Sequence, residues 1–389
     1  MNILYVTDYD PTSRSFGNEQ RTNALWNSLK RHGTVYTLRI LRNAEDPEKY
    51  IDGNHPICYY APHLHIDIPY LNGLFRLLRG VTKVPYFPFP YPLCRKIPGL
   101  FGGIAFDVVV VRYVENFAKF HLWRIAPALV DIDDHPTQLF DTVTYHRLPY
   151  FIRSVAKLLN RILTRYVISK MRGGWISNRE QLKICPSKIR FLPNMPKLPS
   201  AHYCTMEQNR MYLFTVGLMS YKPNYQGVNN FLLTIWPVFH KYHPDVEYLI
   251  GGKDAPQKLV QQWNQIPGVR YVGFVEDLGK VYQHCIATVV PVESGGGTCI
   301  KVLESLAYSR VCLSTVFGAR GIQAYGTGEV DPHGLFVYTT AKEFIGHFEA
   351  LRNPDFRMSE ESETRHFIQN CCLEDQFEKA VDEQFLRLS

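Results

Sequence analysis

The stretch Pro291-Val-Glu-Ser-Gly-Gly-Gly-Thr-Cys-Ile-Lys-Val-Leu-Glu-Ser-Leu-Ala-Tyr308 decides the fold of this chain. Its pattern predicts a strand over residues 287–292, three consecutive glycines, and a helix that begins near Thr298. Glycines let a backbone come close to a ligand, and the first turn of a helix offers unpaired N–H groups, so the junction suits a phosphate. Lys301, one turn into the helix, adds a cation that can neutralise a diphosphate.

The predicted helix has an apolar stripe and a polar stripe. The apolar positions are Ile300, Leu303 and Ala307, and the polar positions are Lys301, Glu304 and Tyr308. We expect the apolar stripe to face a sheet, and the Glu304 carboxylate is placed to accept hydrogen bonds from ribose hydroxyls. An ordinary glycine-rich turn followed by a solvated Lys–Glu pair would use the same residue types, so these types alone leave both interpretations open.

The residues that follow make the pattern more specific. Gly295 to Ala307, followed by Val311-Cys-Leu-Ser-Thr-Val-Phe-Gly-Ala-Arg-Gly-Ile322, resembles the donor-binding region of group 1 glycosyltransferases. These are retaining nucleotide-sugar enzymes, family 4 in the usual classification, and the Gly-Gly-Gly-Thr resembles their bacterial polysaccharide branch. The resemblance implies the α/β GT-B fold, in which two Rossmann-like domains face a central cleft and the last helix crosses back. It implies an N-terminal acceptor domain at 1–195, a nucleotide-sugar domain at 196–372 and the returning helix at 373–389.

Composition agrees with a globular protein of two domains. The chain has 389 residues and 45.0 kDa, with 46% hydrophobic and 20% charged residues. Nine cysteines without a Cys-x-x-Cys pair indicate reduced thiols rather than a disulfide framework or a zinc site. The sequence enters a strand directly after Met1 and has no apolar run of the ~20 residues a spanning helix needs, so we expect a cytoplasmic protein, soluble or peripheral on the inner face of the plasma membrane. The net charge of +7 alone does not indicate nucleic-acid binding.

The first predicted strand, residues 3–7, leads into a long polar loop over residues 8–21. The loop resembles the first loop of the family, where a glycine and a following arginine line the cleft. The resemblance assigns Gly17 and Arg21 to the cleft; a flexible surface loop is the alternative.

A later strand ends in a group of polar residues: Asp131, Asp133, Asp134 and His135. Ligands of open α/β sheets bind at the carboxyl ends of strands. The aspartates are open to three interpretations: a divalent metal site, acceptor or cleft hydrogen bonding by Asp133 and Asp134, or capping of the strand. His135 could orient the hydroxyls of the transferred sugar, or be held structurally. Because this fold usually works without a metal, we predict no metal site and no required cofactor.

Residues 191–199, with three prolines, are predicted to link the two halves. Beyond them the resemblance implies a diphosphate site formed by Gly217, Lys222, Asn224, Gly295, Gly296, Gly297 and Thr298. It implies nucleobase contacts through the main chain of Gly273 and Phe274, with Glu304 on the ribose and Glu293 near the donor sugar. The sequence departs from the family twice, with Leu218 in place of an arginine and Gly296 in place of a second glutamate.

Two stretches of the N-terminal half lack acidic residues, and each suggests an anionic membrane surface as a partner. Residues 70–96 combine basic residues with aromatics and prolines, and residues 142–179 contain eight basic residues. Within the second stretch, Arg153, Lys157, Arg161 and Arg165 recur every four residues beside Ile152, Val155, Leu159 and Ile162. This pattern is typical of a helix that lies on an anionic membrane, and equally of a core-facing helix with a solvated basic face.

The sequence therefore predicts a retaining glycosyltransferase of the hexosyltransferase type. It would move a sugar from a UDP or GDP donor to a saccharide or polyprenyl-linked acceptor in polysaccharide or glycan biosynthesis, with Lys301, Glu304 and His135 as catalytic residues. A sugar-nucleotide epimerase of the same fold and a non-catalytic nucleotide-sugar-binding protein are the alternatives.

Overall fold

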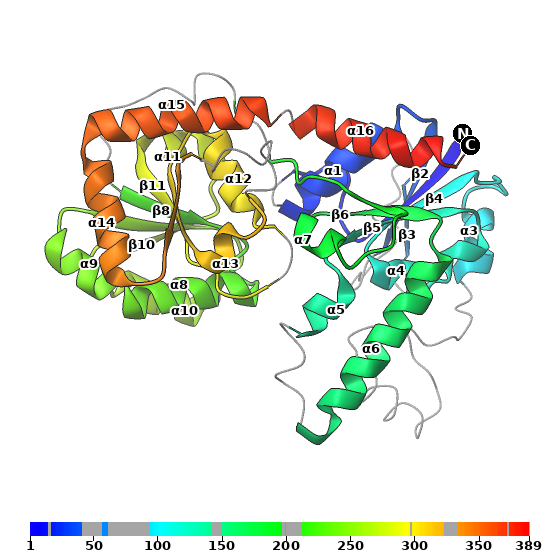
Figure 1. Ribbon diagram of the computed structural model, residues 1–389, viewed down its shortest axis with the longest axis horizontal. Helices are drawn as coiled ribbons and strands as arrows, with labels where there is room; N and C mark the ends of the chain where they lie inside the picture. Colours follow the sequence, from blue (N-terminus) through cyan, green and yellow to red (C-terminus); the bar gives the residue numbers. More distant parts are fainter. Residues whose placement is uncertain are drawn as a thin grey trace. The chain divides into compact units, whose positions relative to one another are not determined.

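The computed structural model describes residues 1–14, 17–40, 57–60, 93–141, 150–196, 199, 212–295, 298–322, 333–371 and 373–388. The chain divides into two compact units, Met1–Pro193 with Glu374–Ser389, and Asn194–Leu373. Each unit is an α/β structure built on one parallel sheet (Figure 1). The division falls within the proline-containing segment 191–199, because proline donates no N–H and cannot continue a regular ladder.

The sheet of the first unit has the described order β3-β2-β1-β4-β5-β6-β7. Its strands are β1 Asn2–Thr7, β2 Thr34–Ile40, β3 Ile57–Tyr60, β4 Val108–Arg112, β5 Ala128–Asp133, β6 Gly173–Ile176 and β7 Ile189–Phe191. All the described pairings are parallel. The strand order reverses between β1 and β4, and such a reversal leaves a crevice at the carboxyl ends of the two strands.

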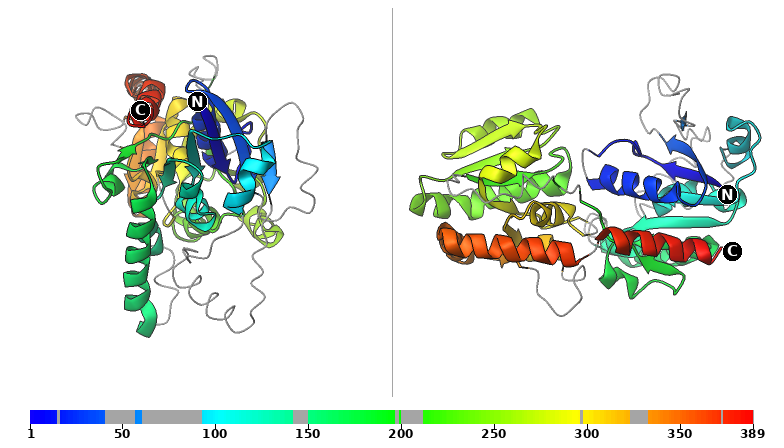
Figure 2. Two further views of the ribbon diagram at one scale, coloured as in Figure 1. Left: turned by 90° about the vertical axis from the view of Figure 1, so that its right-hand side faces the viewer. Right: turned by 90° about the horizontal axis from the view of Figure 1, so that it is seen from above.

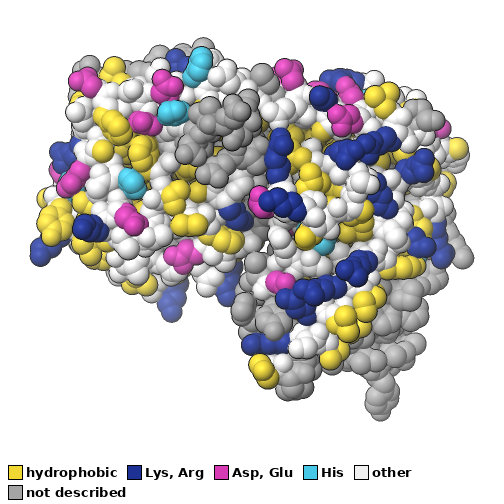
Figure 3. Space-filling view, in the orientation of Figure 1, with side chains coloured by type: hydrophobic (Ala, Val, Ile, Leu, Met, Phe, Trp, Pro, Cys, Tyr) yellow, Lys and Arg dark blue, Asp and Glu magenta, His cyan; other side chains and the backbone are white. Residues whose placement is uncertain are grey.

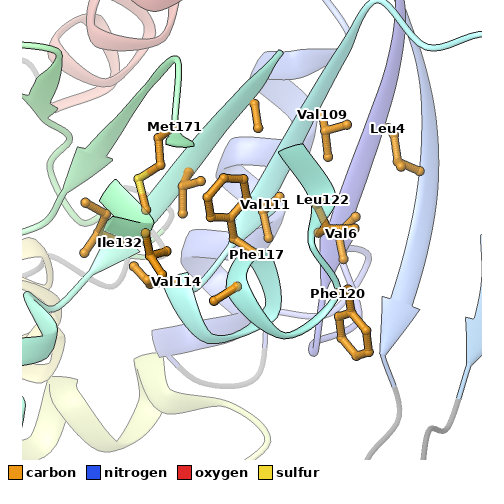
Figure 4. Close-up of a cluster of buried hydrophobic side chains, with 14 of the residues drawn as sticks. Leu4, Val6, Val109, Val111, Val114, Phe117, Phe120, Leu122, Ile132 and Met171 are labelled. Carbon is orange, nitrogen blue, oxygen red and sulfur yellow. The ribbon is translucent and has the colours of Figure 1, made fainter. Parts of the chain in front are cut away.

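The helices of this unit are α1 Gly17–Leu29, α3 Leu93–Leu100, α4 Val114–Lys119, η2 Leu122–Arg124, α5 Pro136–Leu139, α6 Tyr150–Lys170, α7 Arg179–Leu182 and α16 Leu373–Leu386. Valines of β4 pack with Phe117 and Phe120 in the core between sheet and helices (Figure 4). The C-terminal helix α16 contributes to the same unit, because the Trp175 indole donates to the carbonyl of Ala380 at 2.9 Å and the Gln384 amide donates to Gly174.

The sheet of the second unit has the described order β10-β9-β8-β11-β12-β13, also parallel. Its strands are β8 Tyr212–Val216, β9 Glu247–Gly251, β10 Val269–Gly273, β11 Cys285–Val290, β12 Cys312–Thr315 and β13 Leu335–Tyr338. The order reverses between β8 and β11. The loop that begins at Gly217 follows β8, and the glycine stretch at 295–297 follows β11, so the two predicted phosphate loops belong to the strands of the reversal.

The helices of the second unit are α8 Lys222–Thr234, α9 Trp236–Tyr242, α10 Gln257–Asn264, α11 Leu278–His284, α12 Ile300–Ala307, α13 Val316–Ala319, α14 Ala341–Arg352 and α15 Pro354–Asn370. The segment between β8 and β9 forms two helices rather than one continuous helix, because α8 ends at Thr234 and α9 begins at Trp236. Pro237 in the first turn of α9 lacks the N–H that a continuous helix would use. Helix α15 lies beside α12 (Figure 2), and the buried Arg310 and Glu361 form an ion pair at 3.3 Å.

Candidate functional site

The side chains of Lys301 and Asn224 meet beside Gly217, near the ends of β8 and β11 in the second unit. The Lys301 ammonium on α12 donates to the Asn224 side-chain oxygen on α8 at 2.7 Å. A Cβ atom added to Gly217 would lie 2.9 Å from Asn224 Nδ2 and 3.0 Å from Lys301 Nζ. The absence of a side chain at Gly217 therefore lets a cation and an amide come close to the backbone of this loop.

The environment of Lys301 disfavours its charge when nothing is bound. Burial lowers the pKa of Lys301 below its ordinary value, while Cys299 and Glu304 act in the opposite direction. A nearby diphosphate would stabilise the charged ammonium in place of the water that burial removes. This ammonium is therefore better suited to pairing with an anionic ligand than a fully solvated lysine would be.

Gly295, the first residue of the glycine stretch, lies beside the start of α8. A Cβ on Gly295 would lie 3.4 Å from the Tyr221 hydroxyl and 3.7 Å from Pro223, and its φ of +127° favours glycine. Gly296 and Gly297 lie outside the described residues. Thr298 is buried, and its carbonyl accepts from the Asn194 amide at 3.4 Å. Helix α12 begins at Ile300, two residues later than expected, with Cys299 at the N-cap.

The polar stripe of α12 is not solvated. Glu304 and Tyr308 are both buried, the Tyr282 hydroxyl lies 3.5 Å from Glu304 Oε2, and the rings of Tyr282 and Tyr308 stack with centroids 4.4 Å apart. The interpretation of Lys301 and Glu304 as a solvated surface pair is wrong for this reason. Glu304 lies one helical turn after Lys301. Burying a carboxylate costs free energy because the group loses its hydration, so a buried carboxylate is unusual unless it has a role in binding or packing.

The predicted nucleobase segment adjoins the Gly217 loop. The Gly252 N–H donates to the Gly273 carbonyl at 2.7 Å, and a Cβ on Gly252 would lie 1.8 Å from the Gly217 carbonyl oxygen. Phe274 is half-exposed, with the Lys253 ammonium 4.0 Å from its ring centroid. Sequence reasoning did not include Gly252 and Lys253 in the site, although two glycines at the end of a predicted strand already signal a close backbone approach.

Two other predicted residues belong to α8 or contact it. The Glu293 carboxylate accepts from the Asn230 amide on α8 at 2.7 Å and lines a cavity of about 270 Å³ with Phe231, Thr315 and Tyr338. Lys222 is exposed at the first residue of α8, two residues before Asn224. Glu293 thus contacts helix α8, and Lys222 lies in the same turn of that helix as Asn224.

In the first unit, Arg21 belongs to a buried ion cluster. Its guanidinium forms a two-pronged pair with Asp131 at 2.7 and 2.9 Å and donates to the carbonyls of Leu192 and Pro193. Arg112 pairs with the same carboxylate. Burial opposes ionisation of Asp131, but Arg21 and Arg112 hold its pKa below the ordinary value.

This cluster corrects the prediction for the first loop. Gly17 is the first residue of α1, and Arg21 lies inside that helix with its side chain 1% exposed. The alternative of a flexible surface loop is therefore wrong at Arg21. Its buried contacts are those of a residue that stabilises the end of β5, since removing either sign of charge would leave the other uncompensated.

The remaining polar residues after β5 surround the same strand end. Asp133 has a φ of 60° and lies 3.8 Å from Arg21 and 3.7 Å from Arg112, and Asp134 accepts from the Gln181 amide at 3.3 Å. His135 caps α5, where its Nδ1 accepts from the Thr137 N–H. Burial lowers the pKa of His135 to about 4, so the ring is neutral at physiological pH. Nδ1 also lies 2.8 Å from the Thr137 hydroxyl; when Nδ1 accepts from both groups, the proton of the neutral ring is on Nε2, which is then a hydrogen-bond donor.

Within the residues that the structure describes, no group of three or more His, Cys, Asp and Glu side chains could hold a metal ion. No helix in the described part of the chain is both long and apolar enough to cross a membrane.

Comparison with known proteins finds one family model that matches part of the chain. Residues 210–351 match the family model of glycosyl transferases group 1. This segment holds Gly217, Asn224, Gly273, Lys301 and Glu304, and the match supports the predicted relation to group 1 glycosyltransferases. No curated protein matches the sequence.

Solved structures with low sequence identity share the fold. HepE (Alr3699) of Anabaena in complex with UDP is 11% identical with a TM-score of 0.63, and the match covers 98% of this chain and 99% of that one. A trehalose-6-phosphate synthase studied for enzymatic glycosyltransfer with retention is 10% identical with a TM-score of 0.63, over 98% and 99%. TarM is 13% identical with a TM-score of 0.52; the match covers 72% of this chain and only 54% of TarM, so the chain spans about half of its length. The predicted GT-B fold with two Rossmann-like domains is confirmed.

Proposed function

We propose that this protein transfers a sugar from a nucleoside-diphosphate sugar to an acceptor hydroxyl, with retention at the anomeric carbon. One observation carries the proposal. Lys301, Asn224 and Gly217 meet where the order of the second sheet reverses, beside the glycine stretch and inside the segment that matches glycosyl transferases group 1. A cation held against a glycine backbone at a switch point suits a diphosphate.

The proposed reaction requires stabilisation of the departing diphosphate. As the bond between the anomeric carbon and the phosphate oxygen breaks, negative charge accumulates on the diphosphate, and the acceptor oxygen bonds to the anomeric carbon on the same face. The acceptor proton passes to the departing phosphate, so no protein base is required. Preorganised donors contribute about 2–4 kcal/mol each to such a step.

We assign roles to the other predicted residues from their positions in the sequence and the fold. Lys222 and the amides of residues 295–298 would complete the diphosphate site, and Glu304 the ribose contact. Backbone groups of Gly273 and Phe274 would meet the base, and Glu293 would approach the donor sugar. In the N-terminal unit, Asp133 and Asp134 would contact the acceptor, and Gly17 and Arg21 would position the residues around them.

We further propose a UDP donor, because HepE, which has the same fold, binds UDP. The acceptor would be a saccharide, free or polyprenyl-linked, and the product part of a polysaccharide, as in the family 4 branch with Gly-Gly-Gly-Thr. We place the enzyme in the cytoplasm or on the inner face of the plasma membrane.

The decisive experiment incubates the protein with UDP- and GDP-sugars, with and without saccharide and polyprenyl-linked acceptors. Glycosyl transfer releases the nucleoside diphosphate and forms a glycoside whose anomeric configuration, measured by NMR, equals that of the donor. Release of an epimerised sugar would favour an epimerase. Binding of donors without any turnover would favour a non-catalytic protein.

Glu304→Gln is expected to weaken the binding of UDP about tenfold. A hydrogen bond to a carboxylate contributes more than one to a neutral amide, and Gln keeps the size of the buried side chain. Calorimetric titration measures the change. Glu247→Gln, at the exposed start of β9, serves as the control and should bind UDP like the wild type. Equal affinity of Glu304→Gln and wild type would exclude the ribose contact.

His135→Asn is expected to lower kcat by on the order of tenfold while the affinity for UDP stays unchanged. Asparagine is a good N-cap residue, so α5 keeps its cap, but the Nε2 donor is lost. The kcat of the variant should be measured together with its unfolding as a function of pH, which reports the structural role of His135. The folded-state pKa of His135 is about 4 and the ordinary value is about 6.5, so its contribution to stability falls as the pH drops from about 6.5 to about 4. A variant with wild-type kcat would assign His135 to structure only.

A further inference from the structure

We propose that the exposed face of helix α6 docks on the surface of an anionic lipid bilayer. The helix carries an outward apolar stripe of Val155, Leu158, Ile162 and Tyr166, whose side chains are 60%, 59%, 53% and 49% exposed. These positions follow the spacing i, i+3, i+7 and i+11, which places them along one side of a helix. A contiguous exposed apolar face of this kind marks a surface that contacts another partner.

The buried side of α6 is small or polar along its first half. Ala156, Asn160 and Thr164 are each at most 1% exposed, and near the C-terminal end Val167 and Ile168 enter the hydrophobic core. A helix that only packs against its own domain places its largest apolar residues inward and its polar residues outward. In α6 a second set of large apolar residues, those of the stripe, faces outward. The core-facing amphipathic helix considered from the sequence is therefore wrong for Val155 and Ile162.

The structure also changes the expected basic ladder. Successive steps of four residues turn by about 40° on a helix of 3.6 residues per turn, so the four basic residues wind around α6 rather than share one face. Arg153 and Lys157 are half-buried, and Lys157 pairs with Asp141 at 2.9 Å. Arg161 and Arg165 are exposed beside the apolar stripe. Figure 3 shows Lys and Arg side chains next to hydrophobic ones in the region of α6.

The positive charge of α6 favours an anionic partner. Residues 150–170 contain five basic and no acidic residues. A helix with an apolar stripe and arginines beside it fits the boundary between the acyl chains and the head groups of anionic lipids. A symmetric contact with a second copy of this chain would instead bring the arginines of the two helices together, which like charge disfavours.

The placement of α6 suits a flat partner. Its C-terminal end adjoins the sheet of the first unit near β6, and its first turns extend away from the strands (Figures 1 and 2). A helix that extends from its domain in this way leaves its outer side accessible to a flat surface. Of the other basic segment considered from the sequence, residues 70–92 lie outside the described residues, so the proposal rests on α6.

The test is flotation of the full chain with vesicles of phosphatidylcholine, with and without phosphatidylglycerol. Wild-type protein should float with the anionic vesicles at low salt and be released by high salt. The pair Arg161→Glu, Arg165→Glu should weaken binding at least about 25-fold, since each cation near an anionic surface strengthens binding about fivefold. The pair Leu158→Ser, Ile162→Ser should weaken it at least about tenfold.

A matched control carries the same types of change on the second unit, where Leu233 is 75% exposed and Lys241 is exposed. The pair Leu233→Ser, Lys241→Glu should float like the wild type. Three results would overturn the proposal: no flotation of wild type with anionic vesicles, unchanged flotation of both α6 variants, or a wild-type dimer that Leu158→Ser, Ile162→Ser converts to monomer without any vesicle binding. Flotation needs no donor, so it can fail or succeed independently of glycosyl transfer.

Discussion

Lys301→Ala is expected to lower the rate of sugar transfer by on the order of 10² or more. The side chain supplies the cation that donates to Asn224 and lies close to Gly217, and alanine leaves the departing diphosphate without that charge. Stability should change little, because burial already disfavours the charged form of Lys301 and its removal relieves that cost. Release of UDP, measured at saturating donor, gives the rate, and thermal unfolding confirms that the variant is folded.

Lys280→Ala is the matched control for this experiment. Lys280 also lies on a helix of the second unit, but its side chain is 75% exposed and 3.9 Å from Asp277. Its replacement should leave turnover unchanged. Turnover of Lys301→Ala at the wild-type rate would remove the residue from the mechanism. The pH profile gives a second readout: activity that depends on protonated Lys301 declines as pH rises, and burial moves this decline in the free enzyme below the ordinary lysine range.

Asp131→Asn is expected to destabilise the N-terminal unit by about 3–5 kcal/mol. The carboxylate lies between the guanidinium groups of Arg21 and Arg112, and both arginines are fully buried. A neutral amide keeps the shape of the side chain but leaves the two buried cations with only the more distant Asp133 carboxylate, 3.8 Å from Arg21 and 3.7 Å from Arg112. Urea unfolding of the variant against the wild type measures the loss.

The control for Asp131→Asn is Glu180→Gln, which breaks an exposed ion pair with Lys183 and should cost no more than about 0.5 kcal/mol. Wild-type stability of Asp131→Asn would show that the cluster contributes nothing to folding. Because the pKa of Asp131 is lowered in the folded state, its contribution is present above the ordinary aspartate value of about 3.9 and is lost as the pH falls through the lower folded value. The effect of the substitution should therefore be visible at neutral pH.

The sequence by itself determined the architecture of this protein. Apolar runs such as Val108–Arg112 and Cys285–Val290 are buried along their whole length, as expected of strands covered on both faces of a parallel sheet. The glycine stretch after β11 and the lysine one turn later indicated where a diphosphate would bind, because both signals are local: glycine is needed where backbone comes close, and a cation belongs beside an anion.

Only the tertiary structure decided which polar residues are available to a ligand. Arg21 and Asp131 have the residue types of a binding site, yet they pair with each other inside the first unit and are at most 1% exposed. Periodicity could not reveal this, because residues 110 positions apart pair only once the sheet is assembled. Nor could it reveal that α6 turns Leu158 and Ile162 outward. Helical spacing identifies a stripe, but the neighbours that cover or expose that stripe come from distant parts of the chain.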